Sequence, residues 1–133
     1  MVTGVQTCAL PISAPEPAAS ATLRLRFHGS MVLLFGESTL ATGCYRAAID
    51  GVVVRDQQAK PPSETFDPGA FARTCNGNVH LVRVLATGLD AAREHTLDLE
   101  PASGAGKQDG ELRLESVCVA GPGAQAALVP ASR

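Results

Sequence analysis

The stretch Leu23-Arg24-Leu25-Arg26-Phe27-His28 alternates strictly between apolar and polar side chains. Successive side chains of a β-strand point to opposite faces, so this period of two predicts a half-buried strand with its leucines and Phe27 directed inward. Residues 95–100 and 112–115 repeat the pattern with leucine at every second position. The same spacing in three separated segments predicts a fold built from strands that each hide one face.

Other runs predict further strands of different character. Residues 31–35 form a short continuous apolar run, which is typical of a central strand. Residues 79–85 are the most apolar of all, and we expect this strand to be buried on both faces. Residues 112–119 change from alternating to continuously apolar after Ser116, which indicates a β-bulge near that residue.

A hairpin is predicted where Asp50-Gly51 separates two strand-like runs, at residues 45–49 and 52–55. The two-residue turn that joins tightly paired strands needs positive φ at both central residues, and Asp-Gly tolerates it. This is the strongest local turn signal in the chain.

The fold class follows from the number of strands and from the connections between them. No window of helical length carries an apolar stripe at i, i+3 and i+4. A parallel sheet would need crossover helices, whereas six to eight short strands with frequent turns are typical of an antiparallel sandwich or barrel. We therefore predict an all-β fold, an antiparallel β-sandwich.

The ends of the chain are expected to lie outside this folded unit. Residues 2–12 resemble the conceptual translation of a sequencing adapter, so we expect residues 1–12 to be foreign, with a secretory leader or a genuine strand as the alternatives. Residues 13–21 are rich in Pro, Ala and Ser and predict a linker. Residues 121–133 are expected to form a loose tail, which leaves residues 22–120 as the sandwich domain.

Composition excludes several classes of function. The 133 residues fit one domain, and the net charge is −2 from 11 basic and 13 acidic residues. Such a balance argues against a nucleic-acid partner, which usually requires a basic face. No apolar run approaches the ~18 residues of a membrane-spanning helix, so we expect no membrane partner.

The cysteines predict at most one disulfide and no zinc site. If Cys8 belongs to the foreign segment, Cys44, Cys75 and Cys118 remain, and their wide spacing argues against a zinc site. Cys118 lies in an apolar strand and is expected to be a small core residue. Cys44 and Cys75 flank turns and could form one disulfide in an oxidising compartment.

Candidate ligand-contacting side chains gather on the polar face of the first alternating strand. Arg24, Arg26 and His28 share that face, and the choice lies between a cationic ligand-contacting surface and an ordinary solvated sheet face. Asp50 is predicted to be a turn residue first and a ligand contact second. No histidine pair has metal-ligand spacing and no glycine-rich loop ends in Lys-Ser or Lys-Thr, so we expect no metal and no cofactor.

One triplet allows a catalytic alternative. Gly36-Glu37-Ser38 follows an apolar run and resembles the nucleophile block of GDSL-type hydrolases, which implies Ser38 as the nucleophile. In that family the base lies in an Asp-x-x-His motif, whereas the nearest pair here, Asp90 and His95, is spaced differently. A polar loop that contains a serine is the competing interpretation.

Several short marks occur in a characteristic order along residues 23–120: Phe27-His28-Gly29, Ile49-Asp50-Gly51, Gly88-Leu89, Glu94-His95-Thr96-Leu97 and a final strand over residues 112–119. The order resembles the jelly-roll accessory domain associated with GDSL-type (SGNH) hydrolases and carbohydrate esterases. The resemblance implies a galactose-binding-like β-sandwich, jelly-roll-like in topology, that supports a catalytic domain or contacts glycans.

The functional hypothesis is therefore a non-catalytic accessory module of a larger secreted hydrolase. Its expected partners are a neighbouring hydrolase domain and carbohydrate, and its expected location is periplasmic or extracellular. The alternative hypothesis is a truncated GDSL-type ester hydrolase that uses Ser38, and a third is a stand-alone adhesion or assembly domain.

Overall fold

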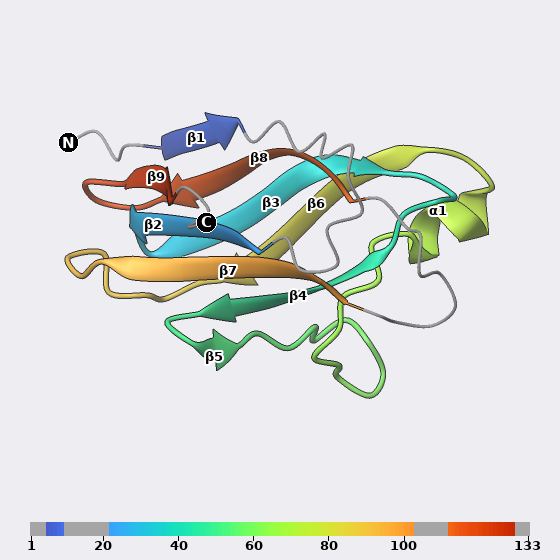
Figure 1. Cartoon of the computed structure of the whole chain (residues 1–133), viewed down its shortest axis with the longest axis horizontal. Helices are drawn as coiled ribbons and strands as arrows, with labels where there is room; N and C mark the ends of the chain where they lie inside the picture. Colours follow the sequence, from blue (N-terminus) through green and yellow to red (C-terminus); the bar gives the residue numbers. More distant parts are fainter. Residues whose placement is uncertain (1–4, 10–21, 103–111, 130–133) are drawn as a thin grey trace.

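The computed structural model describes residues 5–9, 22–102 and 112–129 (Figure 1). Within them the chain forms strands and one short helix. In chain order these are β1 (Val5–Ala9), β2 (Leu23–His28), β3 (Met31–Ser38), β4 (Cys44–Ile49), β5 (Val52–Val53), α1 (Ala70–Cys75), β6 (Val79–Ala86), β7 (His95–Ala102), β8 (Arg113–Ala120) and β9 (Gln125–Val129).

The strands form two antiparallel sheets. The first sheet, called sheet A here, has the order β1-β8-β3-β6, and the second, sheet B, has the order β5-β4-β7-β2-β9. Neighbouring strands run antiparallel in both sheets, and Figure 1 shows the two layers lying along each other. The prediction of an all-β antiparallel sandwich is confirmed.

One hydrophobic core fills the space between the sheets. Sheet B directs Leu25 and Phe27 of β2 into it, together with Leu97 and Leu99 of β7. Sheet A supplies alternate residues of its central strands: Val32, Leu34, Val117 and Val119. The four residues of β2 and β7 lie on the inner faces that the period of two predicts, whereas those of β3 and β8 come from runs that were predicted only as continuously apolar.

Two local predictions are confirmed in detail. Asp50 and Gly51 adopt φ values of 53° and 80° in the turn between β4 and β5, as a two-residue hairpin requires. In β8 the register against β3 shifts, because Phe35 pairs with Ser116 whereas Gly36 pairs with Leu114. Glu115 is the extra residue of a β-bulge at the place where the sequence pattern changes.

The prediction that residues 79–85 are buried on both faces is wrong. Only one face of β6 is covered, and Val82 and Val84 on the other face are 57% and 50% exposed. The physical reason is that a two-layer sandwich covers one side of each sheet, so an apolar run need not be a doubly buried strand. Cys118 was expected in the core and instead pairs with Leu33 on the partly covered outer face of sheet A.

The short helix α1 has no counterpart among the predicted elements. It spans six residues and ends at Asn76, which has a left-handed conformation with φ of 53°. Of its side chains only Ala72 is buried, whereas Phe71 is exposed. Six residues are too few to display a helical stripe, so the periodicity of the sequence carries no signal for this helix.

The chain ends pair more extensively than the sequence predicts. The expected loose tail contains β9, which lies beside β2 from Arg24↔Val129 to His28↔Gln125, so that part of the prediction is wrong. Within the segment interpreted as adapter-derived, β1 pairs with β8. A ladder of main-chain hydrogen bonds can form with almost any sequence, so this pairing does not bear on the origin of the segment. The predicted linker at residues 13–21 lies outside the described residues.

Cys44, Cys75 and Cys118 are free thiols. The bridge considered between Cys44 and Cys75 is therefore not formed. Burial raises the pKa of the Cys44 thiol, with the nearby Asp67 carboxylate acting in the same direction. This favours the neutral thiol at Cys44.

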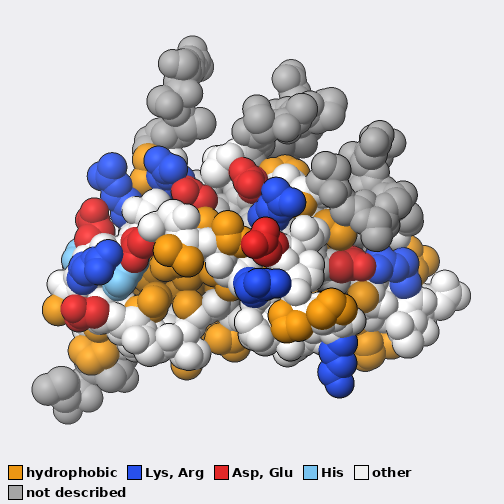
Figure 2. All heavy atoms as spheres, turned by 90° about the horizontal axis from the view of Figure 1, so that it is seen from below, with side chains coloured by type: hydrophobic (Ala, Val, Ile, Leu, Met, Phe, Trp, Pro, Cys, Tyr) orange, Lys and Arg blue, Asp and Glu red, His pale blue; other side chains and the backbone are white. Residues whose placement is uncertain are grey.

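The surface on the side of β4 and β5 mixes apolar and charged side chains (Figure 2). Val52 and Val53 in the short edge strand β5 are exposed. None of the helical segments described here is long and apolar enough to cross a membrane.

Replacing Gly36 by alanine should destabilise the sandwich. A Cβ atom at this position would lie 2.0 Å from the carbonyl oxygen of Arg113, next to the bulge, so β8 would have to move. We expect a loss of about 1–3 kcal/mol in the free energy of unfolding, measured by urea denaturation. The matched control is Gly77→Ala, where the nearest recorded atom lies 4.0 Å away. Equal stability of the two variants would contradict the tight fit at Gly36.

Candidate functional site

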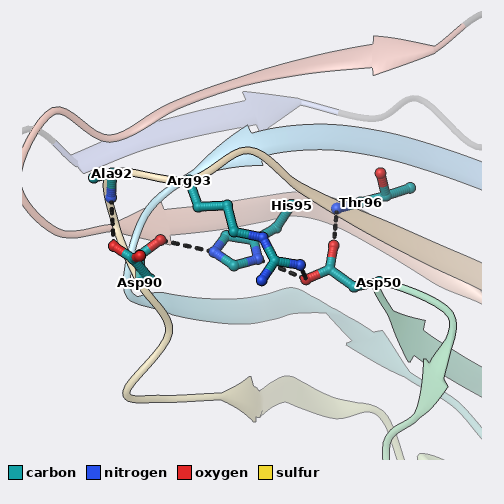
Figure 3. A network of polar contacts seen from close by, with 6 residues as sticks. All are labelled: Asp50, Asp90, Ala92, Arg93, His95 and Thr96. Atoms are coloured by element: carbon teal, nitrogen blue, oxygen red, sulfur yellow. Dashed lines mark hydrogen bonds and ion pairs between the residues drawn. The ribbon is translucent and has the colours of Figure 1, made fainter.

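The most connected polar group of the described residues surrounds the carboxylate of Asp50 (Figure 3). The β4–β5 turn holds this side chain against the start of β7. One carboxylate oxygen, Oδ1, accepts a hydrogen bond from the Thr96 amide at 2.9 Å. The other, Oδ2, lies 2.7 Å from Nδ1 of His95 and 3.6 Å from Nη2 of Arg93. The Asp50 amide also donates to the Thr96 carbonyl at 2.8 Å, so main chain and side chain fix the turn together.

The hydrogen bonds of His95 define its protonation state. The ring is only 4% exposed and packs against Phe27, with 5.4 Å between the ring centroids. Its Nδ1 faces the Asp50 carboxylate, and its Nε2 faces the carbonyl oxygen of Asp90 at 2.8 Å. A carbonyl and an ionised carboxylate can only accept, so this arrangement favours the imidazolium, the form in which both ring nitrogens donate.

The pKa values of the two partners shift in the directions that this pairing requires. The hydrogen bond to Asp50 raises the pKa of His95, and the contact with the Asp90 carbonyl acts in the same direction against the cost of burial. The hydrogen bond from His95 lowers the pKa of Asp50, supported by the Thr96 amide. Each partner therefore stabilises the charged form of the other.

This network joins segments that are far apart in the sequence. Figure 3 shows Asp50 approaching from the β4–β5 turn, while Asp90 and Arg93 come from the connection before β7 and His95 is the first residue of β7. The Asp90 carboxylate in turn accepts from the Ala92 amide at 3.0 Å, which orders that connection. Two of the sequence marks, Ile49-Asp50-Gly51 and Glu94-His95-Thr96-Leu97, thus meet in space and hold one end of sheet B.

The predicted cationic face lies on the outer side of sheet B. Arg24 is neutralised by Asp98, which accepts from its Nε at 2.7 Å and from its Nη2 at 3.0 Å. Arg26 lies between Thr96 of β7 and Ala127 of β9, and no ion pair to it is found among the described residues. His28 is half-buried beside Gln125 of β9. Of the two arginines, Arg26 is therefore the one available to a ligand.

A shallow groove lies at the end of sheet B where β2 ends and β7 and β9 begin. Polar side chains from β2, β9 and the connection before β7 line it: Arg26, His28, Glu94 and Gln125. The aromatic residue next to the groove, Phe27, is only 1% exposed and cannot stack against a ligand. The groove offers hydrogen-bond donors and acceptors for a polar ligand and little apolar contact, which predicts weak binding.

Asp50 is not grouped with the predicted cationic residues. The structure brings Arg26 and His28 together at the groove, whereas Asp50 lies in the hairpin turn with both oxygens engaged by its own chain. A contact between Asp50 and a ligand therefore stays a prediction. The observed contacts give Asp50 a structural role in fixing the β4–β5 turn against β7. From the sequence alone, His95 is considered only beside Asp90, as a pair that does not match the Asp-x-x-His spacing, and is not connected with Asp50. The signal that could have paired His95 with Asp50 is their position beside predicted strands, Asp50 in the Asp-Gly turn of the hairpin and His95 at the start of the alternating run at residues 95–100.

Ser38 lies at the end of β3 and is 1% exposed. It pairs with Val79 of β6, and the neighbouring Glu37 pairs with His80. Because the hydroxyl is enclosed, an ester carbonyl cannot reach it without local opening of the sheet. The geometry gives no support to its assignment as a nucleophile.

Charged side chains at the far end of sheet A are paired with each other. Glu37 accepts from Arg113 at 2.7 Å and from the Asn78 amide group at 3.2 Å, close to His80. In the ranges that the structure covers, no group of three or more His, Cys, Asp and Glu could hold a metal ion. Comparison with protein-family models, with curated proteins and with solved structures found no match.

The Asp50–His95 pair should make stability depend on pH in two directions. His95 has a raised pKa, so its contribution is present below its ordinary value of 6.5 and is lost as pH rises through its folded value. Asp50 has a lowered pKa, so its contribution is present above 3.8 and is lost as pH falls. The contribution of the pair to the free energy of unfolding should be greatest between pH 3.8 and 6.5.

The Asp50→Asn variant tests this assignment. Losing the carboxylate leaves the enclosed imidazole with a weaker acceptor, at a cost of about 1–3 kcal/mol. NMR titration of the His95 ring should give a midpoint above 6.5 in the parent chain and a lower one in the variant. A parent midpoint below 6.5 would show that the pair is not charged in the folded state.

Proposed function

We propose that this chain is a non-catalytic accessory module with jelly-roll topology, which weakly contacts a hydroxyl-rich ligand such as a glycan through the groove at Arg26 and His28. The observation that carries the binding part is the convergence of four polar side chains from three segments on one shallow groove. The proposal also includes a neighbouring hydrolase domain as partner and a periplasmic or extracellular location, both taken from the resemblance to accessory domains.

The strand order supports the jelly-roll assignment. The four observed pairs β1–β8, β2–β7, β3–β6 and β4–β5 are those of one long hairpin, in which the first four strands lie beside the next four in reverse order. Of the remaining pairings, β3–β8 and β4–β7 join successive pairs within each sheet, and β9 is added beside β2 at the edge of sheet B. A hairpin rolled in this way alternates its strands between two sheets, which is the principle of a jelly roll.

Fold alone does not assign a function, so the site must supply the argument. The side chains best suited to catalysis are engaged within the fold: Ser38 is enclosed, and Asp50 and His95 neutralise each other. Arg24 is likewise bound to Asp98. By contrast, Arg26 and Gln125 are exposed and lie within one groove. This distribution favours recognition over covalent chemistry.

The ligand class follows from the donors and acceptors at the groove. The guanidinium of Arg26 donates, the carboxylate of Glu94 accepts, and the amide of Gln125 does both. Sugar hydroxyls can both donate and accept, so they match this mixture. Without an exposed aromatic ring the contact area stays small, and we expect dissociation constants of about 1 mM or weaker.

Titration with neutral and acidic oligosaccharides, followed by NMR of the backbone amides, tests the proposal. We expect shift changes centred on Arg26, His28 and Gln125. Arg26→Ala should weaken binding about tenfold, the loss of one hydrogen bond to a charged group. The control is Arg46→Ala, which removes an exposed arginine from β4 of the same sheet, away from the groove.

Two results would overturn the glycan proposal. One is the absence of shift changes with every oligosaccharide at a concentration that saturates weak sites. The other is equal weakening by Arg26→Ala and Arg46→Ala, which would indicate general attraction to positive charge.

A further inference from the structure

Strand β6 forms one edge of sheet A. β6 pairs with β3 on one side, and no other strand of the described chain lies on its second side. It is eight residues long and contains neither lysine nor proline. Natural edge strands are usually shortened or carry lysine, proline or an inward-pointing charge, because a row of unpaired amides and carbonyls recruits another strand. Of these devices β6 carries the inward-pointing charge, Arg83, which is already paired with Asp56.

The outer face of this edge is apolar. Val82 and Val84 are 57% and 50% exposed, and they stand beside Phe35 and Leu33 of β3 in the ladder. The buried face carries Leu81 and Leu85 into the core. An added strand would therefore find both main-chain hydrogen bonds and an apolar surface along the same line.

The sequence of β6 identifies the strand that fits. Its centre reads Leu81-Val82-Arg83-Val84-Leu85, which is the same in both directions around Arg83. In an antiparallel pair related by a two-fold axis through Arg83, Val82 lies opposite Val84 of the second copy, and Leu81 lies opposite Leu85. Shifting the register by two residues would place Leu81 opposite Arg83.

The arginines at the axis do not oppose this arrangement. The Arg83 side chain points toward the interior, where its Nη1 lies 3.8 Å from Oδ1 of Asp56. It also donates to Gln58 and lies 6.0 Å from the centroid of the Phe66 ring. Each guanidinium thus carries its own counter-charge before the two copies meet.

We propose that two copies of this chain pair through β6, antiparallel and centred on Arg83, so that the two A sheets become one continuous sheet. The register between β3 and β6 shifts at Val32/Leu33, which places an extra residue, Leu85, at the end of the shared ladder. The bulge restricts the pairing to about five residues on each copy. Because the two-fold pairing uses the β6 edge of both copies, this contact closes at the dimer.

Sedimentation of the full chain over a range of concentrations tests the pairing. The apparent mass should rise toward twice the monomer value as the concentration increases. Val82→Lys should abolish that rise, because it places a charge on the exposed apolar face of β6. The control is Val52→Lys, which alters an even more exposed valine on edge strand β5 and should leave the dimer intact. A parent chain that stays monomeric, or a dimer that Val82→Lys leaves unchanged, would overturn the proposal.

Cysteine cross-linking tests the register and does not depend on the lysine variant. Directly opposed side chains have Cβ atoms about 4.5–5.5 Å apart, against 7–8 Å for diagonal neighbours. A mixture of Val82→Cys and Val84→Cys chains should therefore form mixed disulfide dimers well above the level given by either variant alone or by the parent with its free thiols. Cross-linking of Val82→Cys mainly with itself would exclude the axis at Arg83.

Discussion

The fold depends on one constraint: in a two-layer sandwich, a strand can hide only one of its faces. Leucine and phenylalanine at every second position of β2 and β7 meet the alternate residues of β3 and β8, and the core forms between them. The opposite faces must then be compatible with water. On β2 and β7 of sheet B this is achieved with charge, as in the pairing of Arg24 with Asp98, whereas the edge strands β5 and β6 leave valines exposed.

A second interaction orders one end of the sandwich. The β4–β5 turn and the connection before β7 carry no regular ladder of their own, yet the charged pair of Asp50 and His95 fixes both. Since the imidazolium is enclosed against Phe27, solvent screens this pair less than it screens the surface pair of Arg24 and Asp98. Chemical groups that would suit catalysis thus serve to position the segments that border the polar groove.

Local patterns predict the strands because period-two alternation and Asp-Gly turns act over a few neighbouring residues. The sandwich, the hairpin at Asp50 and the bulge after Leu114 could be predicted for that reason. The exposure of Val82, the helix at residues 70–75 and the pairing of β9 could not, since each depends on which segments lie next to it in space. For the site, sequence places Arg26 and His28 on one face, but only the folded chain brings Glu94 and Gln125 beside them.

The extra residue at Glu115 also restricts how β8 can slide along β3. A slip by two residues would keep the leucines and valines facing inward, so hydrophobic patterning alone does not forbid it. Such a slip would carry the crowded backbone of Arg113 away from Gly36 and set it against a residue that has a side chain. The close fit between Gly36 and the bulge therefore selects one register of β8 against β3 among the registers that would all keep the apolar side chains buried.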